Sequence, residues 1–118
     1  MKNNLLIDIS KSFAVDMINL CTQLRENRKG MTMTSQILRS GTSIGANIRE
    51  ANYASGRADF INKMQLALKE CYETEYWLEL FEETSIISEE QFKSMYIKCG
   101  KIRRLLIASI NTAKNNTQ

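Results

Sequence analysis

Apolar residues recur every three or four positions through most of the chain, which is the repeat of one face of an α-helix. Four such stretches, separated by short polar segments, predict helices over residues 4–27, 34–53, 58–84 and 89–114. Four amphipathic helices joined by short loops pack as a bundle. The sequence therefore predicts an all-α protein, an antiparallel up-down-up-down four-helix bundle forming one domain over residues 1–118.

The second stretch contains two glycines in what the pattern predicts to be a helix interior. Gly41 and Gly45 each cost about 1 kcal/mol relative to alanine at such a position. Close approach of another helix is the usual compensation for that cost. We therefore expect this helix to pack tightly on its neighbours through a face with little side-chain bulk.

A polar row lies beside the apolar stripe of the same helix. It contains Ser43, Asn47 and Glu50, and two interpretations are open. In one, the row is a buried network that fixes helix register, with Asn47 bonding across helices and Glu50 pairing with Arg57 or Arg39. In the other, it contacts a ligand or partner.

Residues between the stretches give signals for helix ends. Gly30 suits a left-handed helix end, and either Thr32 or Thr34 is expected as the N-cap of the second helix. Ser88-Glu89-Glu90-Gln91 has the pattern of a capping box, which predicts the start of the fourth helix.

Composition narrows the chemistry. The chain has 118 residues, no proline, no histidine, three cysteines and a net charge of +3. Without histidine, a metal site and neutral-pH acid–base catalysis are both poorly supported. The spacing of Cys21, Cys71 and Cys99 favours buried free thiols. With no signal peptide and no apolar run of membrane length, we expect a cytoplasmic protein. Because the candidate chemistry is poorly supported, we expect no cofactor and no enzymatic activity.

Several large apolar residues of the third stretch fall outside its inner stripe. A wide stripe that buries them in one bundle, or simple exposure, would explain them. A cluster that includes the only tryptophan also fits a protein interface, and it favours a homo-oligomer. The candidate interface residues are Leu66, Tyr76, Trp77 and Leu80.

Charge is distributed unevenly. Residues 70–90 contain eight acids and no base, whereas six bases and no acid follow Glu90. Acidic and basic helices that neutralise each other would explain this pattern. Alternatively, the bases bind nucleic-acid phosphates without reading the base sequence. The candidate contacts are Arg39, Arg49, Lys101, Arg103 and Arg104.

The segment Ser43-Ile44-Gly45-Ala46-Asn47-Ile48-Arg49-Glu50-Ala51 resembles the motif of a known bacterial family. The family comprises four-helix-bundle proteins encoded by intervening sequences inside large-subunit ribosomal RNA genes. Further matches are Leu38, Arg39, Arg57, Asp59, Phe60, Ala67, Glu73, Glu75 and Leu78. Ala51 and the Lys69-Glu70 pair depart from the family pattern.

The resemblance implies a bundle that assembles into a ring, pentameric in this family, and it implies no enzymatic activity. The chain is also similar to the accessory variability protein of diversity-generating retroelements, a basic pentamer that engages a reverse transcriptase and nucleic acid. The expected partners are therefore further copies of the chain, RNA or DNA, and a reverse transcriptase or other protein. A protein-interaction scaffold without nucleic-acid binding is the alternative function.

Overall fold

A computed structural model describes residues 4–115, which form four helices. These are α1 (Asn4–Glu26), α2 (Met31–Ala51), α3 (Arg57–Glu83) and α4 (Glu89–Asn115). The predicted all-α fold with four helices is confirmed, and no strand occurs among these residues. The amino-terminal residues that entered the signal-peptide argument, 1–3, lie outside the described part of the chain.

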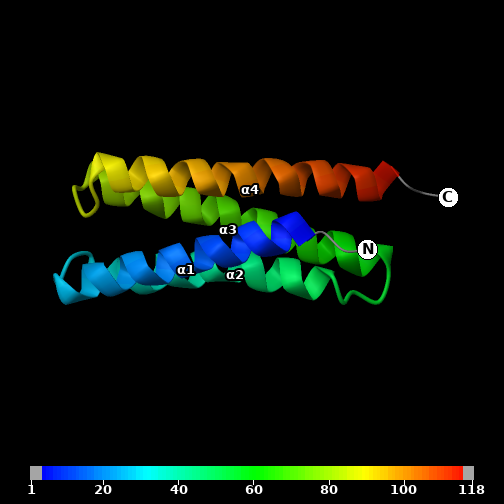
Figure 1. The fold of residues 1–118 in the computed structure, drawn as a ribbon, viewed down its shortest axis with the longest axis horizontal. Helices are drawn as coiled ribbons and strands as arrows, with labels where there is room; N and C mark the ends of the chain where they lie inside the picture. The colour runs from blue at the N-terminus through cyan, green and yellow to red at the C-terminus, as the bar shows by residue number, and fades with distance from the viewer. Residues whose placement is uncertain (1–3, 116–118) are drawn as a thin grey trace.

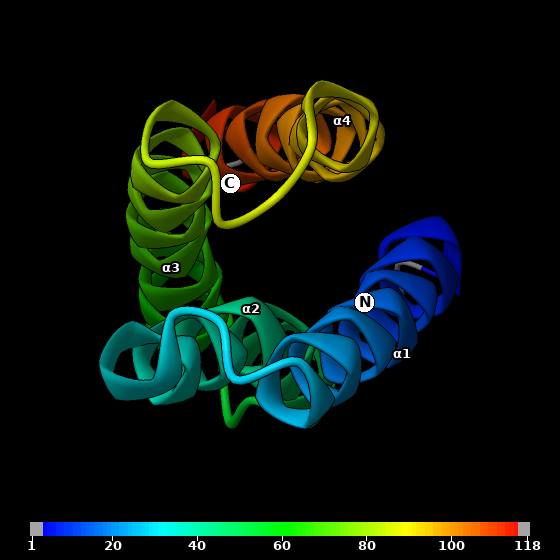
Figure 2. The same cartoon turned by 90° about the vertical axis from the view of Figure 1, so that its left-hand side faces the viewer.

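The helices lie along one long axis, with Cα extents of 52 × 20 × 20 Å (Figure 1). The α1–α2 and α3–α4 turns lie at one end of this axis, and the α2–α3 turn lies at the other. Each helix packs on the next along the chain, whereas α1 and α4 make the least contact of the neighbouring pairs. Figure 2, viewed along the axis, shows α1 and α4 diverging.

Side chains from all four helices fill one apolar core, as the helical periodicity requires. The largest fully buried residues include Phe13 of α1 and Phe81 of α3. The three cysteines are free and buried, which confirms their predicted role as core residues. No helix within residues 4–115 has the length and apolarity needed to cross a membrane.

The start of α2 differs from the sequence prediction. Gly30 takes the left-handed conformation, with φ of 58°, and is itself the N-cap, so the helix begins at Met31. The expected threonine caps are therefore wrong. The Thr34 hydroxyl instead donates back to the Gly30 carbonyl at 2.7 Å. A helix can start this early because glycine tolerates positive φ without a steric penalty.

The start of α4 agrees with the sequence. The Gln91 backbone N–H donates to the Ser88 hydroxyl at 3.1 Å, and the Gln91 side chain accepts from the Ser88 backbone N–H at 2.8 Å. This reciprocal pair is the predicted capping box.

The two glycines of α2 lie against α1, but not equally closely. A Cβ at Gly41 would stand 2.8 Å from Met17 Cγ, whereas a Cβ at Gly45 would stand 3.4 Å from the backbone oxygen of Ser10. The first distance is a clash, and the second is an ordinary contact. Tight packing therefore requires glycine at Gly41, whereas Gly45 has room for a methyl group.

Candidate nucleic-acid interface

Arg39 projects from α2 toward the acidic part of α3. Its guanidinium donates to Glu70 Oε1 at 3.3 Å and to Glu73. The Trp77 indole N–H also donates to Glu73, at 3.0 Å. Hydrogen bonds from Arg39 and then Trp77 hold the pKa of Glu73 below its usual range. Arg39, a predicted nucleic-acid contact, thus has two carboxylate partners inside the subunit.

Arg103 is engaged in the same way on α4. Its Nε donates to Glu75 Oε2 at 2.8 Å, and its guanidinium lies 6.0 Å from the centre of the Tyr72 ring. Glu75 is buried, with 8% of its surface exposed. A buried carboxylate needs such a partner, because desolvation of an unpaired charge is costly. Arg103 therefore neutralises the buried Glu75 carboxylate where α4 packs on α3.

Arg104, one residue further on, is exposed. An added Cβ at Gly100 would lie 3.3 Å from Arg104 Nη1 and 3.4 Å from Arg103 Nη2. Both guanidinium groups thus fold over the backbone at Gly100. A side chain at Gly100 would require these flexible guanidinium ends to shift by a few tenths of an ångström.

Three exposed cations between Glu90 and Leu105 of α4 form no ion pair with any residue in the range 4–115. They recur at helical spacings of eight and three residues, so they share one face. We call Lys93, Lys101 and Arg104 the α4 basic face.

The five predicted nucleic-acid contacts do not form one patch on a single subunit. Helices α2 and α4 do not pack on each other and lie on different sides of the bundle (Figure 2). Arg49 lines a groove of about 250 Å³ between α1 and α2, together with Lys11. The candidates on α2 are therefore separated from those on α4.

The polar row of α2 makes different contacts from those expected. Asn47 donates to the Ser43 carbonyl of its own helix at 2.9 Å, so it does not bond across helices. Glu50 pairs with Lys63 of α3 at 3.2 Å, and neither Arg39 nor Arg57 is its partner. Arg39 instead faces the carboxylates further along α3.

A buried hydroxyl pair performs the cross-helix bonding that was expected of the polar row. Thr74 Oγ1 of α3 donates to Ser40 Oγ of α2 at 2.9 Å, and both residues are fully buried. In the sequence, this bond could have been anticipated from Thr74, because it is a polar residue at a heptad position of the apolar core stripe.

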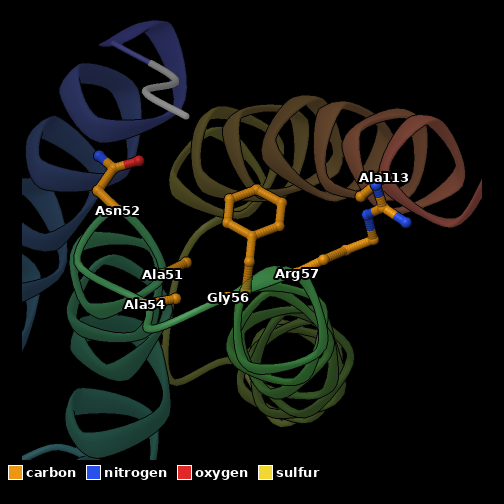
Figure 3. Close-up of a pocket in the computed structure, with 7 residues that line it drawn as sticks. Ala51, Asn52, Ala54, Gly56, Arg57 and Ala113 are labelled. Atoms are coloured by element: carbon orange, nitrogen blue, oxygen red, sulfur yellow. The ribbon is translucent and has the colours of Figure 1, made fainter. Parts of the chain in front are cut away.

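A pocket of about 290 Å³ opens at the end of the bundle that holds the α2–α3 turn (Figure 3). The Arg57 side chain extends toward the carboxyl end of α4, near Ala113. The remaining lining consists of Ala51, Asn52, Ala54, Gly56 and Phe60. This lining offers one cation and one amide over an apolar surface, and it contains no carboxylate, hydroxyl or thiol.

The predicted interface residues of α3 divide into two groups. Leu66 and Tyr76 are exposed, at 37% and 55%, whereas Trp77 and Leu80 are partly buried. Trp77 packs against the core and meets the Tyr76 ring edge-on, with 5.4 Å between centroids. Tyr72, which the sequence did not single out, is also exposed, at 51%. The outer side of α3 thus presents aromatic and aliphatic groups among acids.

Reactive groups are few in the described residues. Burial raises the pKa of the Cys21 thiol to about 11. A hydrogen bond with Cys99, with burial second, raises the pKa of Cys71. Both thiols are therefore protonated at neutral pH and lack the thiolate needed for nucleophilic attack. No cluster of three or more metal-ligating side chains occurs in residues 4–115.

These features define the class of protein by its fold, which is a four-helix bundle. Comparison with known proteins gives a narrower assignment. The family model described as 23S rRNA-intervening sequence protein matches residues 2–108. The chain belongs to this family. No match was found among curated proteins.

A solved structure is similar over nearly the whole chain. It is a protein of unknown function from the S23 ribosomal protein family of Bacteroides thetaiotaomicron VPI-5482, with 53% sequence identity and a TM-score of 0.90. The match covers 94% of this chain and 99% of that one. Sequence and fold comparisons therefore agree on the family, which confirms the resemblance seen in the central motif.

Proposed function

We propose that the protein is a non-enzymatic, cytoplasmic accessory protein that binds the phosphate backbone of RNA or DNA. The observation that carries this proposal is the α4 basic face, whose three exposed cations have no carboxylate partner within residues 4–115. Exposed cations at helical spacing can each meet a phosphate, and release of condensed counterions drives such binding.

The predicted contacts contribute unequally to this proposal. Arg104 and Lys101 belong to the basic face, and Arg49 is exposed on another side of the subunit. Arg39 and Arg103 already form ion pairs with carboxylates of α3, so a phosphate would have to compete with those carboxylates. We therefore assign the primary contacts to α4 and treat Arg39 and Arg103 as structural.

Substitution of Arg104 tests the proposal without disturbing a buried ion pair. Arg104→Glu should weaken binding of a fluorescein-labelled RNA oligonucleotide by about fivefold to tenfold at low salt, because it replaces an attraction by a repulsion. Lys69→Glu, on the exposed side of α3, is the matched control, since it makes the same change of net charge. Equal loss in both variants would show that only net charge matters and would contradict the assignment to α4.

We also propose that the antiparallel up-down bundle assembles as a ring-like homo-oligomer, and the family resemblance alone indicates a pentamer. The supporting observation is that Leu66, Tyr72 and Tyr76 of α3 are each exposed. Exposed apolar groups of this size are typical of protein interfaces. Assembly would repeat the α4 basic face around one particle. A monomer in solution would contradict this proposal.

The same surface supports a second candidate function, a protein-interaction scaffold. Its aromatic groups lie on the helix that carries the acids, so a basic protein partner, such as a reverse transcriptase, would be complementary to it. Affinity capture from nuclease-treated lysate discriminates the two functions. Recovery of one protein partner, with no binding of purified RNA, would favour the scaffold.

A further inference from the structure

Two turns share one end of the bundle, which is the end that faces the viewer in Figure 2. The α1–α2 turn forms one side of this end, and the α3–α4 turn forms the opposite side. The two turns meet where a Cβ added at Gly30 would stand 3.1 Å from Cγ2 of Ile86. We call the surface made by residues 25–30 and 82–90 the turn end.

The side of the turn end made by residues 25–30 is basic. Its three cations and its single acid, Glu26, give it a net charge of +2. All three cations are exposed, and none forms an ion pair with a residue of the described range 4–115. These cations are Arg25, Arg28 and Lys29. They are therefore available to an anionic partner.

The side made by residues 82–90 is acidic. It contains four acids and no base, so its net charge is −4. Three of the acids are exposed, and Glu82 is partly buried. In the part of the chain that the structure describes, no cation forms an ion pair with Glu82, Glu83, Glu89 or Glu90. The two sides of the turn end thus carry opposite charges that are not paired within the subunit.

Helix dipoles account for some of these charges, but not for Glu82 and Glu83. Arg25 lies in the last turn of α1, and Glu89 and Glu90 lie in the first turn of α4, where their charges are favourable. Glu82 and Glu83 end α3, whose last turn contains no base. The dipole disfavours negative charge at that position. A cationic partner would offset this cost, and the subunit itself does not supply one within residues 4–115.

A face with one basic and one acidic side is complementary to itself, because a two-fold rotation places each side over the opposite side of a second copy. We propose that two copies of the chain pair end to end through the turn end. The basic side of each copy then faces the acidic side of the other. This contact goes beyond the proposed function, since it joins bundle ends and is separate from the ring assigned to α3. It can join two single subunits or stack two rings.

The size of the turn end sets the strength of this contact. The two shorter Cα extents of the molecule are 20 Å each, so the end covers less than the roughly 800 Å² per partner of a standard interface. Exposed charges over so small an area give a weak association that salt screens. The paired form should therefore depend on both protein concentration and ionic strength.

Sedimentation equilibrium of nuclease-treated protein tests the contact. At low salt the mass of the wild type should double as the concentration rises, and high salt should abolish the doubling. Glu82→Lys/Glu83→Lys should raise the dissociation constant of the pair about tenfold, because the symmetric contact contains both substitutions twice. Asp8→Lys/Glu50→Lys is the control, since it makes the same change of net charge at exposed acids outside the turn end and should have a smaller effect.

A mixture of two variants tests whether opposite sides face each other. Arg28→Glu/Lys29→Glu should also weaken pairing about tenfold on its own. Mixed in equal amounts with Glu82→Lys/Glu83→Lys, it should recover part of the pairing, because the intact basic side of one variant then faces the intact acidic side of the other. Recovery on mixing cannot result from unfolding. The α3 variant should also keep its midpoint of urea denaturation, since lysine suits the carboxyl end of a helix.

The outcomes separate this inference from the proposed function. A wild-type mass that is the same at low and high salt at every concentration would overturn the end-to-end contact, as would equal effects of the α3 variant and its control. Loss of RNA binding in Arg28→Glu/Lys29→Glu, with its mass unchanged, would assign the basic side to nucleic acid and also overturn the contact. Doubling from a monomer would support the contact and overturn only the ring.

Discussion

At the scale of single residues, the space around each glycine of α2 determines which substitutions the helix tolerates. Gly41 and Gly45 occupy similar sequence contexts, yet only Gly41 faces a side chain at clash distance, Met17 of α1. The sequence showed that two glycines lie inside a helix, but it could not show how closely α1 approaches each of them. That distance depends on the angle at which the two helices cross.

Alanine at these two positions should therefore have opposite effects. Gly45→Ala should raise the free energy of unfolding by up to about 1 kcal/mol, because helix propensity improves and the methyl group has room. Gly41→Ala should lower it by about 1 kcal/mol, since overpacking against buried Met17 outweighs the same gain. Urea denaturation followed by circular dichroism measures both. Stabilisation of equal size in the two variants would show that α1 does not pack tightly on Gly41.

At the scale of elements, ion pairs link α2 to α3 at the edge of their buried contact. Arg39 bridges Glu70 and Glu73, and Trp77 adds its indole N–H to Glu73. Because these donors lower the pKa of Glu73, the carboxylate stabilises the fold above its unfolded pKa of about 4.3. This contribution disappears as the pH falls through the lower folded pKa.

Glu73→Gln should reveal this contribution by its pH dependence. At pH 7 the variant should be less stable by about 0.2–1 kcal/mol, as expected for an exposed pair, and the difference should vanish in acid. Trp77, the only tryptophan, gives a fluorescence signal for the junction during urea denaturation. Glu83→Gln, at the exposed end of α3, is the control for loss of one negative charge. A difference that persists unchanged at low pH would contradict the assigned role of the carboxylate.

The elements also show what sequence patterns can predict. Periodicity identified four helices and their inner faces, because burial of an apolar stripe is a property of each helix alone. The Ser88 capping box was predictable for the same reason. The partners of Glu50 and Arg103 were not, since Lys63 and Glu75 become neighbours only through the rotation of one helix against another.

At the scale of the whole molecule, the charges and cavities are arranged around the bundle rather than gathered at one centre. Acidic α3 neutralises Arg39 of α2 on one side and Arg103 of α4 on the other. On α4, Lys93, Lys101 and Arg104 are exposed and form no ion pair within residues 4–115. The sequence indicated an excess of bases near the carboxyl end, and the fold determines which of them remain available.

Light scattering during size-exclusion chromatography, with and without added RNA, tests the central claim most directly. For nuclease-treated protein we expect a mass that is a multiple of 13.6 kDa, with an increase on addition of a single-stranded RNA oligonucleotide at low salt and loss of that increase at high salt. A monomer whose mass is unchanged by RNA at any salt concentration would contradict both the assembly and the nucleic-acid binding proposed for this protein.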